Sequence, residues 1–253
     1  MGPCKLLSVI VPLYNEADCI QIFFPQLASV LSRLDCAHEI LLVNDGSQDE
    51  TGQVIDRLCA EYQNGRSIHL AKNKGKDGAV QIGLGAARGD AAVIIDGDGQ
   101  HPPELVAQML AIREQDDVPI VSGVKSRPTG AEEHAWISWA YLNFFSWVTG
   151  IDVKHSTDYK LVDRVVIDKI MEFQGNFVFF RALIKKFNFA ERELAFVVQK
   201  RVSGSTRWSF LSLLRLAVSS LWIHLRLRKQ LAAQEQRPSS AWSPAGSAQR
   251  QNG

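Results

Sequence analysis

The 253-residue sequence lacks the cysteine and histidine patterns of disulfide-rich and zinc-binding proteins. Its four cysteines all lie in the first quarter of the chain and form no C-x-x-C pair. This usage predicts reduced thiols rather than a disulfide framework. The six histidines show no zinc-ligand spacing with one another or with the cysteines, so no zinc site is expected.

Long hydrophobic runs and a strong net charge are also absent. The 28 Lys and Arg residues balance 27 Asp and Glu to a net charge of +1, which indicates no nucleic-acid partner. No apolar run reaches the ~18 residues of a membrane-spanning helix, because charged residues interrupt the most apolar stretch, Trp208–Leu227. No charged leader precedes the first apolar segment, so no secretory signal peptide is predicted. We expect a cytoplasmic protein, either free or bound peripherally to the cytoplasmic face of a membrane.

Two common nucleotide-binding motifs are missing as well. Gly83, Gly85 and Gly89 are spaced as G-x-G-x-x-x-G rather than G-x-G-x-x-G, and they precede a predicted strand instead of following one. No G-x-x-x-x-G-K-[ST] segment occurs, which excludes a P-loop. A nucleotide site in this chain would have to be built differently.

Residues 1–120 alternate between short β-branched runs and longer segments with apolar residues at helical spacing. The expected strands are Leu7–Val11, Glu39–Val43, Ser67–Leu70, Ala91–Ile95 and Pro119–Val121. The expected helices are Ala17–Leu34, Asp49–Tyr62, Asp77–Arg88 and Pro103–Gln115. Such alternation predicts an α/β fold with a mostly parallel sheet flanked by helices on both faces.

The alternation fades after residue 125, and the composition changes again near the C-terminus. The later expected elements are an apolar helix at 135–148, strands near Asp158–Val162 and Leu194–Gln199, and an amphipathic helix at Trp208–Leu231. From Ala233 the chain is rich in Ala, Gln, Ser, Pro and Gly. We expect one domain at 1–232 and a disordered tail at 233–253.

Polar loops follow the predicted strands, at the sheet edge where ligands bind in parallel α/β folds. After the fourth strand, Asp96 and Asp98 place two carboxylates two residues apart, and Gly97 between them permits a tight turn. Gln100 adds a neutral oxygen. A diphosphate would complete the octahedral shell of Mg²⁺ or Mn²⁺ on these oxygens. We predict a metal site at this loop; the alternative is a solvated turn.

Two further loops at this edge are candidates for the nucleotide. Asp45 follows the second strand and could accept hydrogen bonds from a pyrimidine imide or a ribose hydroxyl. The alternative for that loop is helix capping by Ser47 or Asp49. After the third strand, a three-lysine cluster suits a phosphate, with Lys76 as the first choice, although a solvated run of charge is the alternative.

Together and in this order, these segments resemble family 2 glycosyltransferases of the GT-A fold, a Rossmann-like α/β fold. The likeness is to the branch of dolichol-phosphate mannosyltransferases and other polyprenyl-phosphate hexosyltransferases, and it covers residues 5–228. The segments that carry it are Val9-Ile-Val-Pro-Leu-Tyr-Asn-Glu16, Val43-Asn-Asp-Gly-Ser-Gln-Asp49, Asn73-Lys-Gly-Lys-Asp77, Ala87-Arg-Gly-Asp90, Asp96-Gly-Asp-Gly-Gln-His-Pro-Pro-Glu104, Ser156-Thr-Asp-Tyr-Lys-Leu161 and Arg201-Val-Ser-Gly-Ser-Thr-Arg-Trp208.

The resemblance implies a role for each matching residue. The nucleotide-binding residues would be Pro12, Tyr14, Glu16, Asp45, Lys76 and Asp77. The residues that hold the metal on the diphosphate would be Asp96, Asp98 and Gln100. Basic residues near the phosphates and the acceptor would be Lys125, Arg127, Lys160, Arg201 and Arg207. The catalytic carboxylates would be Asp158, beside the acceptor, and Asp98.

The chain departs from the family pattern at three places. Asn44 stands where the first of two aspartates is usual, and Tyr159-Lys160 replaces Phe-Arg after Asp158. The sequence also shows no C-terminal transmembrane helices, which many members of this branch carry. Single displacement with inversion is implied, with Asp158 as general base toward a hydroxyl or as a positioning group for a lipid phosphate. The alternative for Asp158 is an ion pair with Lys160 or Arg164.

The function implied is metal-dependent transfer of a hexose from a UDP- or GDP-sugar to a polyprenyl or dolichyl phosphate at a membrane surface. Asp45 favours UDP. The aromatic residues of Trp136–Val148 and the basic end of the last helix are typical of interfacial helices. Alternatively, these helices pack on the domain, in a homo-oligomer, or on a separate membrane partner.

Three other functions compete with this interpretation. A soluble family member would glycosylate a glycan, a protein or a small-molecule hydroxyl. A non-catalytic nucleotide-sugar-binding module would have lost its metal motif, yet Asp96, Asp98 and Gln100 are all present. A nucleotidyltransferase would carry a Gly-rich first loop, whereas the first strand here ends in Pro-Leu-Tyr-Asn-Glu.

Overall fold

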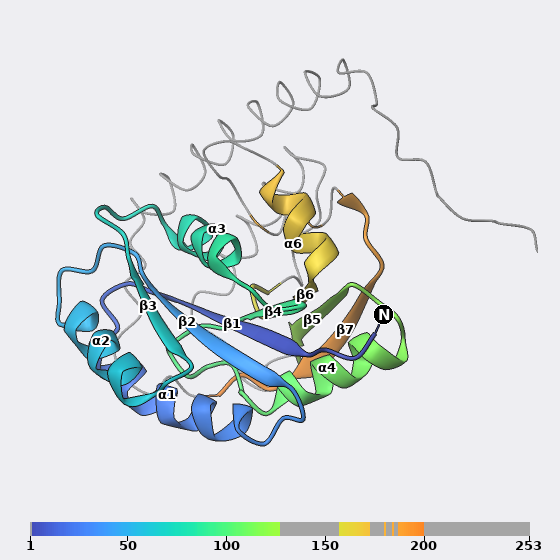
Figure 1. The fold of residues 1–253 in the computed structure, drawn as a ribbon, viewed down its shortest axis with the longest axis horizontal. Helices are drawn as coiled ribbons and strands as arrows, with labels where there is room; N and C mark the ends of the chain where they lie inside the picture. Colours follow the sequence, from blue (N-terminus) through green and yellow to red (C-terminus); the bar gives the residue numbers. More distant parts are fainter. Residues whose placement is uncertain (1, 127–156, 173–179, 181–183, 185–186, 200–253) are drawn as a thin grey trace, which may run out of the picture. The chain divides into compact units, whose positions relative to one another are not determined.

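The computed structural model describes residues 2–126, 157–172, 180, 184 and 187–199. In these residues, seven strands form one sheet in the order β3-β2-β1-β4-β6-β5-β7 (Figure 1). The strands are β1 (Leu6–Leu13), β2 (Ala37–Asn44), β3 (Gly65–His69), β4 (Ala91–Ile94), β5 (Ile120–Lys125), β6 (Lys160–Asp163) and β7 (Glu191–Phe196). The first six begin or end within a few residues of the predicted bounds, and β7 begins three residues before its predicted start.

Helices cover both faces of this sheet. The described helices are α1 (Ala17–Leu31), α2 (Thr51–Glu61), α3 (Lys76–Ala86), α4 (Leu105–Gln115) and α6 (Arg164–Met171). In Figure 1, α1, α2 and α4 lie on one face, and α3 and α6 lie on the other. The predicted α/β class, a GT-A-type sheet flanked by helices, is therefore confirmed.

The strand directions are mostly parallel, with one exception. β1 pairs in parallel with β2 and β4, β2 pairs in parallel with β3, and β5 pairs in parallel with β7. β6 runs antiparallel to both of its neighbours, β4 and β5. This one reversed strand brings the chain that precedes it to the carboxyl edge of β4.

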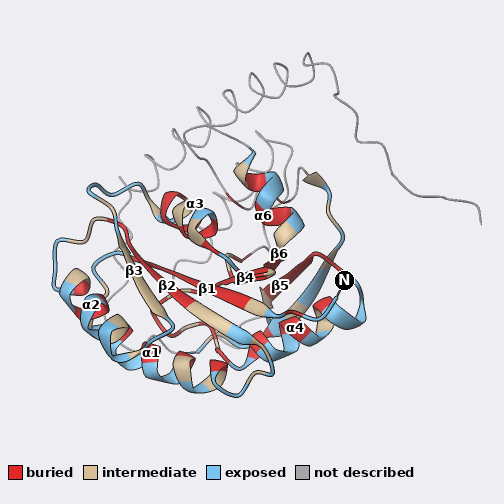
Figure 2. Cartoon of the chain, viewed as in Figure 1, coloured by how far each residue is buried: buried red, intermediate tan, exposed pale blue. Residues whose placement is uncertain are grey.

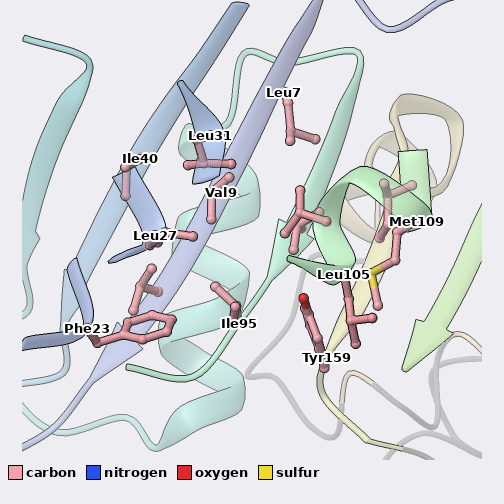
Figure 3. Close-up of a cluster of buried hydrophobic side chains, with 14 of the residues drawn as sticks. Leu7, Val9, Phe23, Leu27, Leu31, Ile40, Ile95, Leu105, Met109 and Tyr159 are labelled. Carbon is pink, nitrogen blue, oxygen red and sulfur yellow. The ribbon is translucent and has the colours of Figure 1, made fainter. Parts of the chain in front are cut away.

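The main hydrophobic core lies between the sheet and the α1, α2 and α4 face. The central strands are buried (Figure 2), and their apolar side chains meet the buried stripe of α1. Phe23, Leu27 and Leu31 stand four residues apart on α1, so they share one face and pack toward Val9 and Ile40 of the sheet (Figure 3). Each such buried side chain contributes about 1.5–3 kcal/mol of hydrophobic stabilisation. This core fixes the sheet edge on which the polar loops stand.

Several predictions concern residues outside the described ranges. They are the helix at 135–148, the last helix at Trp208–Leu231, the tail at 233–253 and the domain boundary between them. Within the described part of the chain, none of the helices has the length and apolar character needed to cross a bilayer.

Candidate active site

The candidate site lies at the carboxyl edge of the sheet, where β1 stands between β2 and β4. From β1 the chain passes to β2 and β3 on one side and returns to β4 on the other. At such a switch point the loops diverge and leave room for a ligand. Because β6 is antiparallel to β4, the residue before β6 reaches the same edge as the residues after β4. The fold thus brings Asp158 to the loop of Asp96.

Side chains of the loop after β2 hold the loop after β1. Asn15 has a left-handed backbone with φ of 54°, and its N–H donates to Ser47 Oγ at 3.0 Å. The N–H of Ala17, the first residue of α1, donates to Asp49 Oδ2 at 3.4 Å. Asp49 Oδ1 accepts the N–H of Thr51, the first residue of α2, at 3.0 Å. Asp49 thus binds the first amide of both α1 and α2, whereas the N-cap residues of these helices, Glu16 and Glu50, make no side-chain cap.

Asp45 holds the lysine-rich loop after β3. It is only 3% exposed, its N–H donates to the carbonyl of Leu13, and its Oδ1 accepts the N–H of Lys74 at 2.7 Å. Gly46 has φ of 66°, and a Cβ there would lie 2.7 Å from the backbone nitrogen of Asn73. Burial raises the pKa of the Asp45 carboxyl. One oxygen of Asp45 thus binds the lysine-rich loop. The contact of Asp45 with a nucleotide base stays a prediction.

Asn44 makes two hydrogen bonds that explain why an amide stands here. Its Oδ1 accepts the N–H of Ser47 at 2.9 Å, and its Nδ2 lies 3.2 Å from Nδ1 of His69. The other ring nitrogen of His69 lies 2.9 Å from Asp56 Oδ1, so it carries the proton and Nδ1 accepts. An ionised carboxylate could not donate to that Nδ1. The departure from the family pattern at Asn44 therefore follows from its partner.

Lys76 joins two carboxylates from different parts of the fold. It is the first residue of α3, and its ammonium lies 2.5 Å from Asp96 Oδ1 and 2.9 Å from Asp158 Oδ2. The side chain of Lys76 is 40% exposed, whereas that of Asp158 is 12% exposed. Of the two partners considered for Asp158, Lys160 forms an ion pair with Glu191 and Arg164 with Asp168. This bridge places the predicted donor loop and the predicted acceptor residue in one cluster.

The charges of this cluster keep its members ionised. Burial alone would lower the pKa of Lys76, but the charges of Asp96 and then Asp158 outweigh it and raise that pKa above its ordinary value. Burial alone would raise the pKa of Asp96, but the charge of Lys76 outweighs it and the pKa is lowered. At neutral pH the cluster therefore holds an ammonium and an ionised Asp96.

The loop after β4 turns at a different glycine from the one expected. The left-handed residue is Gly99, with φ of 77°, and not Gly97. Gly97 is required for another reason, because a Cβ there would collide with Leu13 Cδ2 of β1 and would lie 3.3 Å from Glu16 Oε2. The loop is closed by the N–H of Gln100, which donates to Asp98 Oδ1 at 3.0 Å. The expected tight turn thus exists, but Gly97 serves close packing.

The donor atoms of this loop fit part of a divalent-cation shell. Asp96 and Asp98 supply carboxylate oxygens, the ligands that Mg²⁺ and Mn²⁺ prefer, and Gln100 stands beside them. Among the described residues, no group of three or more His, Cys, Asp or Glu side chains is arranged to hold a metal ion. A bound ion would therefore need further oxygens from a diphosphate or from water.

His101 is a site residue to which the sequence analysis assigned no role. It is 5% exposed, and its Nδ1 accepts the N–H of Asp96 at 3.3 Å. Its ring stacks on Tyr159 with centroids 4.9 Å apart and meets Phe196 edge-on at 5.5 Å. Burial, assisted by the charges of Lys76 and Lys125, lowers the pKa of His101 against the opposing charge of Asp96. In the sequence, only the position of His101 directly after Gln100 pointed to a place in the site.

The residues predicted for the nucleoside stand at the expected edge. Pro12 is buried near the end of β1, and Tyr14 directly after it is 45% exposed. Glu16 lies against the Gly97 turn. Asp77 Oδ1 accepts the N–H of Phe180 at 3.0 Å, which ties α3 to a later segment. Their contacts with a nucleotide stay predictions.

Lys160 has a different environment from the one predicted. It is fully buried, and its ammonium bonds to Ser122 Oγ of β5 and to Glu191 Oε1 of β7, the latter at 2.9 Å. These contacts join β6 to β5 and β7. They give no support to the predicted role of Lys160 toward a phosphate or acceptor, because its charge already serves a buried ion pair.

Of the other predicted basic residues, the structure describes only Lys125. It is exposed at the end of β5, and because β5 runs in the same direction as β4, it lies at the same edge of the sheet as the Asp96 loop. Arg127, Arg201 and Arg207 lie outside the described residues. At the end of the described segment after β7, Gln199 donates its N–H to the carbonyl of Gln100 at 3.1 Å.

This geometry agrees with the match to a known family. Residues 8–187 match glycosyl transferase family 2. The chain belongs to glycosyl transferase family 2. This glycosyltransferase is 31% identical over 225 residues to an uncharacterized glycosyltransferase of Synechocystis sp., in a match that covers 85% of this chain and 68% of the relative. The recognised family and the enzyme class are therefore confirmed.

Two further comparisons extend the likeness. The chain is 24% identical over 224 residues to the undecaprenyl-phosphate 4-deoxy-4-formamido-L-arabinose transferase of Pseudomonas savastanoi pv. phaseolicola, covering 85% of this chain and 64% of that one. This chain thus spans less than two thirds of that relative's length. In fold it is similar to a mannosyltransferase from Pyrobaculum calidifontis in complex with GDP-Man and Mn²⁺, with a TM-score of 0.60 at 18% identity, over 91% of this chain and 65% of that one.

Proposed function

We propose that this glycosyltransferase transfers a hexose, with inversion and with the help of a divalent ion, from a UDP- or GDP-sugar to a polyprenyl phosphate at a membrane surface. The observation that carries the proposal is the bridge of Lys76 between Asp96 and Asp158. It joins the loop that would hold the donor diphosphate to the residue that would face the acceptor. A non-catalytic binding module would need only the loop that holds the donor diphosphate.

On the donor side, Asp96, Asp98 and Gln100 would hold Mg²⁺ or Mn²⁺ together with the diphosphate oxygens. The ion would neutralise charge that develops on the departing nucleoside diphosphate. Lys76 lies beside the same loop, so its ammonium can contribute to that stabilisation. The solved mannosyltransferase with GDP-Man and Mn²⁺ supports a nucleotide-sugar donor and a divalent ion.

On the nucleoside side, Pro12, Tyr14 and Glu16 would line the pocket, with Asp45 toward the base. Asp45 is buried and one of its oxygens holds the Lys74 amide. The other oxygen can accept the N–H of a uracil imide or of a guanine ring, since both bases offer an N–H donor. UDP is our first choice for the donor.

On the acceptor side, Asp158 would act in one of two ways. Toward a hydroxyl, it would take the proton while the acceptor oxygen forms the new bond to the anomeric carbon and the nucleoside diphosphate leaves from the opposite side. A lipid phosphate is already ionised near neutral pH, so Asp158 would then orient the acceptor. Lys76 holds the carboxylate turned toward the donor loop in both cases.

The lipid acceptor and the membrane location rest on two supports. The relative at 24% identity is named an undecaprenyl-phosphate transferase. The sequence also carries aromatic and basic residues typical of interfacial helices, in 136–148 and 226–229. We infer a peripheral protein on the cytoplasmic face, acting alone, as a homo-oligomer or with a separate membrane partner.

The test is transfer from labelled UDP- and GDP-hexoses, with Mn²⁺ or Mg²⁺, to polyprenyl phosphate in detergent. We expect label in the organic phase from one donor, lost on removal of the ion and in Asp98→Asn. Asp35→Asn, an exposed aspartate in the loop before β2, is the matched control and should keep the activity. Label that stays in water with every lipid would contradict the lipid acceptor. If no donor gives any product, the enzymatic proposal itself is wrong.

A further inference from the structure

We propose that His101 is a positioning residue of the donor site. Its Nδ1 fixes the Asp96 loop, and its ring joins that loop to Tyr159, the residue directly after Asp158. The inference rests on the proposed function in that Asp96 and Asp158 are taken as the donor-side and acceptor-side carboxylates.

The hydrogen bond at Nδ1 determines the tautomer of His101. The N–H of Asp96 points at Nδ1 from 3.3 Å, and a backbone amide can only donate. Nδ1 must therefore be the lone-pair nitrogen, and the ring proton sits on Nε2. The competing arrangement, an Nδ1–H directed to Asp96 Oδ2, is disfavoured because that oxygen is 3.7 Å away and the amide proton would face the ring proton.

The ring of His101 is held between two aromatic side chains. Tyr159 stacks on it at an interplanar angle of 18°, and Phe196 of β7 meets it at 79°. Tyr159 and Phe196 also contact each other, with centroids 5.7 Å apart. The Tyr159 hydroxyl donates to the carbonyl of Pro102 at 2.7 Å. Stacked and edge-to-face contacts of this kind favour one orientation of the ring.

These contacts connect the two halves of the site through neighbouring residues. His101 and Pro102 follow the Asp96–Gln100 loop, and Tyr159 directly follows Asp158. A shift of the loop would thus break the stack, and a shift of Asp158 would pull on Tyr159. The separation that Lys76 spans is therefore set by this aromatic cluster as well as by charge. A Phe at position 159 could not make the bond to Pro102.

Two substitutions separate the acceptor nitrogen from the ring. In His101→Asn the side-chain oxygen stands close to the place of Nδ1 and can accept the Asp96 amide, whereas His101→Leu offers no acceptor. Both lose the aromatic stack, so they differ chiefly in that hydrogen bond. Tyr159→Phe retains the ring and removes only the bond to Pro102.

In transfer assays we expect His101→Leu to lower kcat by about 10–100-fold, because a misplaced reacting group costs about that much. His101→Asn should recover at least about half of that loss on a logarithmic scale. KM for the nucleotide sugar should change less than kcat in both. Equal kcat in the Asn and Leu variants, or a loss confined to thermal stability, would overturn the proposal.

A second readout does not depend on transfer. Nitrogen-15 NMR of the ring of His101 in the whole wild-type chain, assigned by comparison with His101→Asn, reports which nitrogen carries the proton. We expect a protonated Nε2 and an unprotonated, hydrogen-bonded Nδ1 at neutral pH. A protonated Nδ1 would overturn the proposal even if sugar transfer is observed. Absence of transfer in the wild type together with the expected tautomer would refute the proposed function and leave the role of His101 in the loop standing.

Discussion

At the scale of single residues, Lys76 determines how charge is distributed in the site. Its ammonium contacts both Asp96 and Asp158. Without that ammonium, the two carboxylates would lie near each other with no positive charge between them. Like charges at such a distance raise each other's pKa, and the charge of Asp158 acts on Asp96 in that direction. One lysine therefore keeps Asp96 ionised beside a second carboxylate, where the substrate would bind.

Replacing Lys76 by Met should lower transfer by at least about tenfold, because the acceptor-side carboxylate loses its orienting partner. The matched control is Lys169→Met, an exposed lysine of α6 to which no role in the site is assigned. It should stay within about threefold of the wild type. Steady-state rates with saturating donor and acceptor test this, and equal losses in the two variants would contradict it.

The same substitution gives a pH-dependent change in stability. The Asp96 pKa is lowered on folding, so its contribution is present above the ordinary carboxyl pKa of about 3.9 and is lost as the pH falls further. The Lys76 pKa is raised, so its contribution is present below about 10.4 and is lost above that pH. Urea unfolding should therefore show a constant difference between wild type and Lys76→Met from about pH 5 to 9. The difference should shrink below about pH 4.

The limits of sequence-based prediction are visible at this scale. Asp45, Lys76 and Asp96 were correctly placed at one sheet edge, because the ends of parallel strands are known once the strands are. The contacts that individual side chains make were not predictable. Which side chain faces Lys160, or which glycine of the Asp96 loop takes a positive φ, depends on neighbours that are distant in sequence.

At the scale of elements, a buried ion pair joins α4 to the start of α6. Arg113 of α4 donates from Nε to Asp163 Oδ2 at 2.9 Å and from Nη1 to the carbonyl of Gly2 at 3.1 Å. Asp163 Oδ1 accepts the N–H of Val165 and so caps α6. Arg113 is 4% exposed, and this pair therefore ties one helix, one strand end and the N-terminal segment together.

Arg113→Met should destabilise the fold by about 3–5 kcal/mol, because it leaves the Asp163 carboxylate buried without its partner. Adding Asp163→Asn should recover a substantial part, since Asn is neutral and can still cap α6. The free energy of unfolding in urea, extrapolated to water, measures both. A loss below about 1 kcal/mol in the single variant would show that the pair is solvated.

Helix α3 offers a second test, because two of its glycines have opposite environments. Gly83 is buried, and a Cβ there would collide with Ile10 Cγ2 of β1. Gly85 is exposed, and its Cβ would meet only the flexible end of Met171, at 3.0 Å. We expect Gly83→Ala to cost about 1–3 kcal/mol and Gly85→Ala to be neutral or to stabilise by up to about 1 kcal/mol. Thermal melts of both distinguish close packing from backbone entropy, and equal effects would contradict the packing of α3 on β1.

At the scale of the whole molecule, the order of strands accounts for the site. Alternating strand and helix patterns predicted the five strands before residue 126 and the helices between them. The reversal of β6 was not predicted, because a short strand of four residues carries no directional signal in its sequence. That reversal is what carries Asp158 to the edge where Asp96 lies. The donor half of the site was therefore predicted from the strand ends, and the bridge to the acceptor half needed the topology.

The most direct test of the central claim, a metal-assisted nucleoside diphosphate site at this edge, is calorimetric binding of UDP and GDP with and without Mn²⁺. Two carboxylates alone hold Mn²⁺ weakly, so we expect little binding of the ion by itself and strong mutual enhancement with the nucleotide. Asp98→Asn should remove that enhancement, whereas Asp35→Asn should keep it. Nucleotide binding that is indifferent to Mn²⁺, or unchanged in Asp98→Asn, would contradict the account.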